Sequence, residues 1–138
     1  MNGKVMKQVE NPDEARMLYE FMHHNGVEMG REDGAGFFAS VDETLVAGAF
    51  VKVGDTLDIK TGIPLEGIAC ISYFYVLPMM RGQKTGSLLA GVVESTFRNG
   101  GFPEMYVSAN TPEFWKKRGY DHLDKAGESY LLRKVLRP

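Results

Sequence analysis

Apolar residues recur along the chain with two spacings, one typical of strands and the other of helices. Alternating or continuous apolar runs, bounded by glycine, proline and acidic residues, predict six strands. These strands are expected at residues 4–10, 37–41, 45–53, 69–77, 104–110 and 129–136. The run at 69–77 is rich in β-branched and aromatic residues, so we expect it to be a central, well-buried strand.

Helical spacing predicts three helices between these strands. The first has Asn11 as its N-cap and Pro12 in its first position, and it ends at an Asn-Gly pair. The second spans residues 85–99 and is stopped by two consecutive glycines. The third is a short helix within residues 111–120, with Thr111 as its cap.

The element order is therefore β-α-β-β-β-α-β-α-β, with loops at residues 26–36 and 54–67. The second and third strands form a hairpin, and the helix at 85–99 makes the fourth and fifth strands parallel neighbours. The expected fold is α/β (α+β), with a mixed, twisted sheet of six to seven strands and helices on both faces. With no internal repeat or linker in the sequence, residues 1–138 are expected to form a single domain.

Composition and charge narrow the possible functions. A net charge of −2 opposes nucleic-acid binding by broad phosphate neutralisation. Cys70 is the single cysteine, so no internal disulfide can form and a reducing compartment is favoured. No apolar stretch is long enough to span a membrane, and the first residues lack a signal-peptide core. We expect a cytoplasmic monomer or homodimer that binds neither nucleic acid nor membrane.

Candidate chemistry lies in the turn after the expected central strand, where Arg-Gly-Gln-Lys-Thr-Gly precedes the 85–99 helix. Amides at a helix start lack intrahelical acceptors, and Gly82 and Gly86 keep side chains away from them. Arg81 and Lys84 add positive charge beside the helix dipole. The turn suits a phosphate group, and a capped helix start without a ligand has the same pattern. The spacing matches neither a P-loop nor a Rossmann fingerprint.

Two segments together resemble a known family. The segment YVLPMMRGQKTGSLL resembles the acyl-CoA-binding motif of the GNAT family of N-acetyltransferases, Arg/Gln-x-x-Gly-x-Gly/Ala. The segment NTPEFWKKRGY resembles that family's Asn followed by a short helix that ends in Gly and an aromatic residue. The order of the expected strands and helices matches the family as well, so the resemblance covers essentially the whole chain.

The resemblance implies acetyl-CoA as the cofactor, bound where the two parallel strands separate. The turn amides would hold the pyrophosphate, the backbone of the central strand would pair with the pantetheine, and a lysine of the short helix would meet the 3′-phosphate. The cofactor-binding residues that it implies are Phe74, Val76, Arg81, Gly82, Gln83, Lys84, Thr85, Gly86, Ser87, Asn110, Trp115 and Lys117.

Two of these positions depart from the family pattern. Lys84 stands where the motif has its first glycine, and we expect the lysine to fit only with a negative φ. Trp115 stands where many members have a tyrosine that protonates the leaving thiolate. An indole has no usable proton at neutral pH, so we expect Trp115 to be a core anchor.

The resemblance also implies direct attack of an amine on the thioester, with the Val76 amide as oxyanion donor. Where several members carry a Glu or His base, this chain has Cys70 and Ser72. Because side chains alternate along a strand, these two residues and Phe74 are expected to share one face. Neither a thiol nor a hydroxyl ordinarily has a pKa suited to a base at pH 7. Tyr73, Tyr75 and Ser108 are further candidates for proton transfer.

Acidic residues in the 26–36 loop are candidates for binding a cationic amine, although a solvated loop would contain the same residues. They are Glu28, Glu32 and Asp33. His23 and His24 are adjacent and would point about 100° apart on a helix, so we expect a surface or cap feature there and no metal site.

We therefore expect an N-acetyltransferase that moves an acetyl group from acetyl-CoA to a primary amine of a small molecule or a protein. The alternative is a catalytically degenerate GNAT-fold module that binds CoA or a protein partner without acyl transfer. A third possibility is an interaction domain without CoA, in which the glycine-rich turn only caps the helix. The acceptor is not apparent from the sequence.

Overall fold

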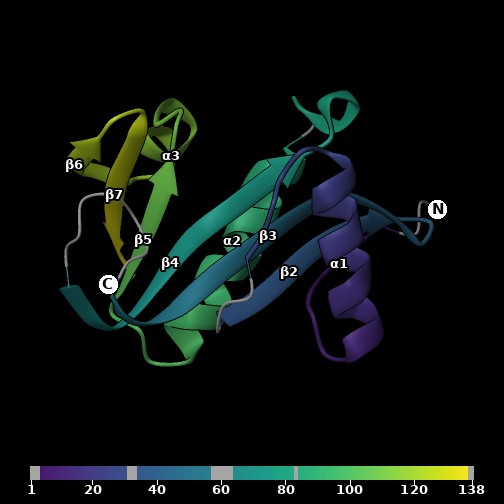
Figure 1. The fold of residues 1–138 in the computed structure, drawn as a ribbon, viewed down its shortest axis with the longest axis horizontal. Helices are drawn as coiled ribbons and strands as arrows, with labels where there is room; N and C mark the ends of the chain where they lie inside the picture. The colour runs from purple at the N-terminus through teal and green to yellow at the C-terminus, as the bar shows by residue number, and fades with distance from the viewer. Residues whose placement is uncertain (1–3, 31–33, 57–63, 83, 137–138) are drawn as a thin grey trace.

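The computed structural model describes residues 4–30, 34–56, 64–82 and 84–136. Within these residues seven strands form one sheet in the order β1-β2-β3-β4-β5-β7-β6 (Figure 1). The strands are β1 (Lys4–Gln8), β2 (Gly34–Val41), β3 (Thr44–Thr56), β4 (Pro64–Val76), β5 (Glu104–Ala109), β6 (Asp121–Ala126) and β7 (Ser129–Val135). The helices are α1 (Pro12–His24), α2 (Thr85–Asn99), α3 (Glu113–Lys117) and a 3-10 turn, η1 (Pro78–Met80).

The sheet is mixed, and its two faces are covered by different helices. β4 and β5 are parallel, and β2 and β3 form an antiparallel hairpin, as the sequence predicts. The remaining neighbouring strands are also antiparallel. Leu18 and Met22 of α1 pack with Phe38 on one face. Leu89 and Val93 of α2 belong to the larger core on the other face, to which α3 also contributes (Figure 1). The expected α/β sheet with helices on both faces is confirmed.

The strand β6 has no counterpart among the predicted strands. It lies at the edge of the sheet and pairs only with β7. Its sequence, DHLDKA, carries charges and lacks a clear alternation, because an edge strand buries little and is often protected by charged residues. Gly127, with φ of 61°, makes the turn of this hairpin.

Three strands extend into segments that the glycine content predicts as loops. β2 begins at Gly34, inside the expected 26–36 loop, and β3 and β4 continue to Thr56 and from Pro64, inside the expected 54–67 loop. The glycines of β2 are needed for packing and not for turning. A Cβ on Gly34 would collide with the Val51 carbonyl oxygen, and one on Gly36 would lie 2.6 Å from Leu18 Cδ2.

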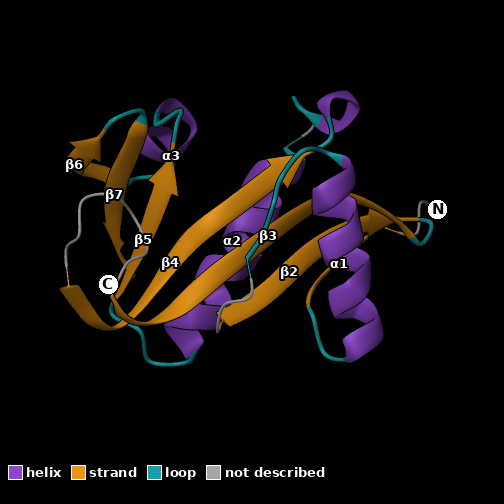
Figure 2. Cartoon of the chain, in the orientation of Figure 1, coloured by secondary structure: helices purple, strands orange, loops and turns teal. Residues whose placement is uncertain are grey.

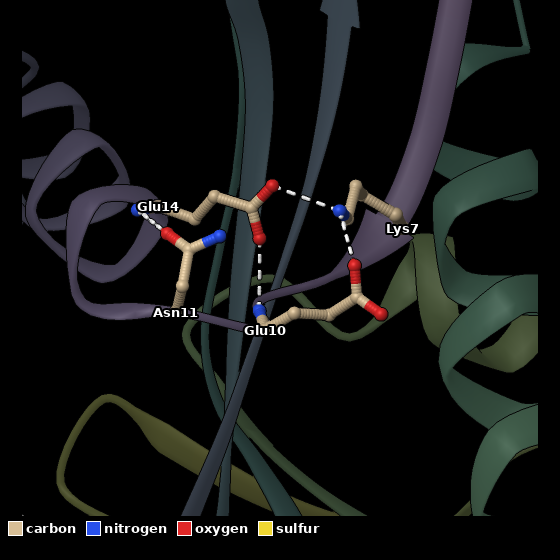
Figure 3. Close-up of polar contacts among 4 residues, drawn as sticks. All are labelled: Lys7, Glu10, Asn11 and Glu14. Atoms are coloured by element: carbon tan, nitrogen blue, oxygen red, sulfur yellow. Dashed lines mark hydrogen bonds and ion pairs between the residues drawn. The ribbon is translucent and has the colours of Figure 1, made fainter.

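The start of α1 is held by side chains of its own connection to β1 (Figure 3). The side chain of Asn11 accepts a hydrogen bond from the Glu14 amide at 2.8 Å, and Pro12 is in the first turn, so the predicted cap is confirmed. The Glu14 carboxylate accepts from the Glu10 amide and from Lys7 Nζ, each at 2.8 Å. In the described part of the chain, no helix is long and apolar enough to cross a membrane.

Candidate functional site

β4 and β5 separate over the second half of β4. They pair only from Ala69 with Met105 to Ile71 with Val107. Beyond these pairs the strands diverge (Figure 2), and a cavity of about 890 Å³ opens between them. This volume lies within the range of small-molecule sites. The predicted site residues that line it are Ser72, Tyr73, Phe74, Val76, Arg81, Gly82, Lys84, Gly86, Ser87, Asn110 and Trp115.

A bulge in β4 begins where the cavity opens. Phe50 of β3 pairs with Tyr73 and the next residue, Val51, with Ile71, so Ser72 is the extra residue. The bulge reverses the alternation of side chains, since Ile71 and Phe74, three residues apart, contact the same core. Tyr73 and Tyr75 pack on the opposite, α1 face.

The expectation that Cys70 shares a face with Phe74 is therefore wrong. Cys70 packs with Tyr106 and Leu131 in a separate small cluster, and it is 1% exposed. It is not among the residues that line the cavity. Burial raises the pKa of its thiol to about 12, so it has the properties of a core residue and not of a base.

The backbone of β4 directs polar groups into the cavity. The Leu77 amide donates to the Val46 carbonyl of β3 at 2.9 Å. In an antiparallel ladder alternate residues turn toward the same neighbour, so the amides of Phe74 and Val76 point away from β3, toward the separation. The Val76 carbonyl accepts from Arg81 Nε at 2.9 Å. The Val76 amide is thereby placed beside a positively charged group.

The turn between β4 and α2 exposes a run of amides. The Arg81 amide donates to the Pro78 carbonyl, and the first bond of α2 runs from the Leu88 amide to the Lys84 carbonyl. Within the described residues, the amides of Gly82 and of residues 84–87 donate to no protein carbonyl. α2 also has no side-chain cap and no acidic residue in its first turn. An anion in the cavity would meet several free N–H groups.

Lys84 differs from the expected conformation. Its φ is 63°, in the left-handed region, so the expectation of a negative φ is wrong. A non-glycine residue there carries a cost of about 1–2 kcal/mol. The left-handed backbone turns the chain into α2 as the motif's glycine would, while the exposed lysine side chain lies at the cavity.

Trp115 of α3 belongs both to the core and to the cavity wall. It is 4% exposed, as expected for a core anchor, and its ring meets that of Phe74 edge to face at 4.9 Å. Tyr120 packs against it from behind at 5.4 Å and donates its hydroxyl to Glu94 at 2.8 Å. Burial, and next the charge of Glu94, raise the pKa of Tyr120, so Tyr120 cannot replace the missing tyrosine as an acid. The N-cap position of α3 is Pro112 and not, as expected, Thr111, and no side chain caps the helix.

The side chains of other predicted site residues are not in the cavity lining, or the residues lie outside the described part of the chain. Thr85 is buried, and Lys117 is exposed on α3 outside the lining. Glu28 is exposed and pairs with His23 Nδ1 at 2.7 Å, at the end of α1. His23 and His24 are exposed in the last turn of that helix, a surface feature as expected. Gln83, Glu32 and Asp33 lie outside the described residues.

The structure adds Val27 and Ser129, which the sequence pattern did not single out, to the residues that line the cavity. The candidate hydroxyls of Tyr75 and Ser108, and Phe114 of the short helix, also lie in its lining. Tyr75 lies on the same face of β4 as Tyr73, as the two-residue spacing between them in the sequence indicates for a strand. Ser129 comes from β7, more than fifty positions after the bulge, and only the folded sheet brings it near.

Comparisons with known proteins agree with this geometry. The family model of the acetyltransferase (GNAT) family matches residues 5–120. A sequence search of curated proteins gives no significant match.

Solved structures share the fold at low sequence identity. PaiA N-acetyltransferase from Thermoplasma acidophilum, in complex with coenzyme A, is 19% identical with a TM-score of 0.62, over 88% of this chain and 70% of its own. Ard1 from Thermoplasma volcanium is 14% identical with a TM-score of 0.71, over 98% and 99%. Arabidopsis thaliana Naa50, in complex with the bisubstrate analogue CoA-Ac-MVNAL, is 16% identical with a TM-score of 0.67, over 96% and 98%.

Proposed function

Because this chain belongs to the acetyltransferase (GNAT) family, an acetyl-CoA-dependent family, we propose that it transfers the acetyl group directly to a primary amine. Both substrates would be bound together in a ternary complex. The observation that carries the proposal is the split between β4 and β5, with the free amides of the α2 turn at one end and the Val76 amide along its wall.

The residues of the cavity fit CoA in charge and in shape. The amides of Gly82 and of residues 84–87 would hold the pyrophosphate, together with Arg81 and Lys84. The absence of a Cβ at Gly86 leaves the amides accessible next to Val76 and Phe114. Asn110 and Trp115 would line the pantetheine path. Lys117, which is exposed on α3, would contact the 3′-phosphate of CoA.

The chain's own groups would contribute positioning and electrostatic stabilisation. Acetyl-CoA supplies an acetyl group activated as a thioester. The Val76 amide would donate to the carbonyl oxygen as it gains negative charge, a contribution worth about 3 kcal/mol in other enzymes. Holding the amine next to the thioester lowers the activation barrier further, because the two reactants have already lost their translational and rotational entropy on binding.

Proton transfer would run through hydroxyl groups and water. Among the described residues that line the cavity there is no carboxylate or histidine, whereas Ser72, Tyr73, Ser108 and Ser129 contribute hydroxyls. An acceptor amine that arrives neutral needs no strong base. We therefore expect the rate to rise with pH as the free acceptor amine is deprotonated.

The amines to test as acceptors can be chosen from a similar structure and from the acidic residues proposed to bind the amine. Naa50, to which this chain is similar in fold, was solved with an analogue that joins CoA to a peptide, so peptides with a free N-terminus belong in the first panel of acceptors. Polyamines and amino acids complete the panel, since Glu28, Glu32 and Asp33 are proposed contacts for a cationic amine.

Two measurements test the proposed function. Isothermal titration with CoA should give saturable binding, and thiol release from acetyl-CoA should depend on an amine from the panel. No heat and no thermal shift at millimolar CoA would contradict CoA binding at this cavity. Binding of CoA without thiol release for any amine would favour the non-catalytic module.

A further inference from the structure

A buried carboxylate lies behind the cavity wall, away from the reacting groups. Glu94 of α2 is 3% exposed and accepts three hydrogen bonds from two other parts of the fold. Its Oε2 accepts from the Tyr120 hydroxyl at 2.8 Å. Its Oε1 accepts from Arg118 Nη2 at 2.9 Å and from Lys134 Nζ at 3.2 Å. Arg118 and Tyr120 follow α3 directly, and Lys134 belongs to β7.

The hydrogen bonds to Glu94 fix the position of α3, a helix too short to be stable without tertiary contacts. α3 has five residues and no side-chain cap, and a helix this short is unstable on its own. Phe114 and Trp115 of this helix both line the cavity. The position of the wall therefore depends on what fixes the end of α3.

A continuous series of aromatic contacts joins Glu94 to the cavity. Tyr120 packs on Trp115 at 5.4 Å, and Trp115 packs edge to face on Phe74 at 4.9 Å and on Phe114 at 4.8 Å. Phe74 follows the β4 bulge, where the strands have just separated. A shift of Tyr120 would therefore be transmitted to both sides of the separation.

Stability alone does not account for the carboxylate. A buried ion pair is commonly no more stable than well-packed apolar side chains of the same volume, because desolvation offsets the attraction. Arg118 also leaves its Nε buried without a partner, so its position is set mainly by the bond from Nη2 to Glu94. The arrangement fixes the relative position of two segments, since three hydrogen bonds from the residues after α3 and from β7 converge on the two carboxylate oxygens of Glu94.

We propose that Glu94 is a positioning residue, which fixes the end of α3 through Arg118 and Tyr120 and so sets the Trp115 wall of the acetyl-CoA cavity. The inference rests on the proposed function for its role in CoA binding, while the position of Trp115 can be measured without CoA. Glu94 itself touches neither the cavity nor the substrates.

The test uses Trp115 as its probe, because it is the chain's single tryptophan. Glu94→Met keeps an apolar side chain of similar length and removes the acceptor for Tyr120, Arg118 and Lys134. We expect this variant to fold, with Trp115 emission shifted to longer wavelength and with CoA affinity, measured by titration calorimetry, lowered about 5-fold or more. Tyr120→Phe removes only the hydroxyl and should change both quantities in the same direction.

Two further variants separate positioning from general stability. Glu94→Gln keeps an oxygen for the two cations and an amide that can donate to the Tyr120 hydroxyl, so it should restore CoA affinity to within about 2-fold. Leu131→Ala removes buried volume from the small cluster of Cys70, Tyr106 and Leu131, which is not part of the cavity lining, and should destabilise the fold without changing CoA affinity.

The outcomes distinguish the two proposals. A folded Glu94→Met protein with wild-type Trp115 emission and CoA affinity would overturn the positioning role, and so would an equal loss of affinity in Leu131→Ala. If the wild-type protein binds no CoA, the proposed function fails, and the emission of the free variants still decides whether Glu94 positions Trp115.

Discussion

The first turns of α1 and α2 meet the same physical requirement in opposite ways. Each helix start presents amides without intrahelical acceptors. In α1 the protein supplies the acceptor, because the Asn11 side chain caps the helix (Figure 3). Asp13 and Glu14 place negative charge in its first turn. In α2 there is no side-chain cap and no acid in the first turn, and cations stand there instead.

The charges around α2 make the contrast sharper. Arg81 and Lys84 line the cavity beside the helix start, and Lys4 Nζ lies 3.4 Å from Thr85 Oγ1. Cations next to the positive end of a helix dipole destabilise the free protein. A bound anion would offset this loss of stability and that of the left-handed backbone at Lys84, because it would neutralise the positive charge at the helix start. The comparison teaches that the protein itself caps one helix start and leaves the other open, and it is the open one that we propose as the phosphate site.

The largest expected effect comes from making α2 resemble α1. Gly86→Asp would place a carboxylate at the α2 amides, and a Cβ there would lie 3.4 Å from Val76 Cγ2, an ordinary contact. We expect CoA affinity to fall about 30-fold or more, because the new charge competes with the pyrophosphate for the amides and both cations. The fold should keep its thermal stability.

Titration calorimetry with CoA and a melting curve check this prediction. Ser95→Asp is the matched control, since it adds the same charge to an exposed position further along α2 and should leave the affinity within about 2-fold. Unchanged affinity in Gly86→Asp would show that the turn is not the pyrophosphate site.

Replacing Lys84 should have two smaller effects of opposite sign, one on the stability of the fold and one on CoA affinity. Lys84→Gly relieves the left-handed backbone and should raise the free energy of unfolding by about 0.5–1 kcal/mol. The same change removes a cation from the cavity and should weaken CoA binding about 5-fold. Denaturant unfolding and CoA titration measure the two quantities separately.

Lys84→Arg is the control for this trade between stability and binding. It keeps both the positive charge and the strained backbone, so we expect neither quantity to change appreciably. If Lys84→Gly gained stability with no loss of CoA affinity, the lysine would not contribute to the anion site.

At the start of α1 the expected effect concerns stability alone. Asn11→Ala removes the acceptor for the Glu14 amide and should lower the free energy of unfolding by about 1 kcal/mol. CoA affinity should stay at the wild-type value, because neither Asn11 nor Glu14 lines the cavity. Asn11→Asp retains the cap and should restore most of the stability; a loss of CoA affinity in Asn11→Ala would contradict the separation of the two roles.

The comparison also explains which features could be predicted from the sequence. Both helix starts were recognisable, because a cap residue, a proline and acids precede α1, and glycines and cations precede α2. These are local signals, carried by residues next to the amides that they affect. The parallel pairing of β4 and β5 followed from the intervening helix, which is a matter of connectivity.

Features that depend on non-local packing could not be predicted. The bulge at Ser72 reverses the alternation of β4 only because β3 pairs on both sides of it, and this removed Cys70 from the expected face. The glycines of β2 resembled loop residues until their neighbours were known. Glu94 cannot be singled out from the sequence, since a glutamate within an amphipathic helix gives no sign of burial until Arg118, Tyr120 and Lys134 surround it.

The smallest expected effect is a pH dependence at the start of α1. The hydrogen bond from Lys7, and then that from the Glu10 amide, lower the pKa of Glu14 below its ordinary 4.5. A carboxylate with a lowered pKa in the folded protein contributes stability above the ordinary pKa and loses it as the pH falls through the folded value. Glu14→Gln does not titrate, so the wild-type protein should be the more stable of the two near pH 6, and the difference should shrink and vanish as the pH is lowered beneath 4.5. Thermal melts of both proteins across this range measure the difference, and a difference independent of pH would mean that Glu14 acts through its shape and not through its charge.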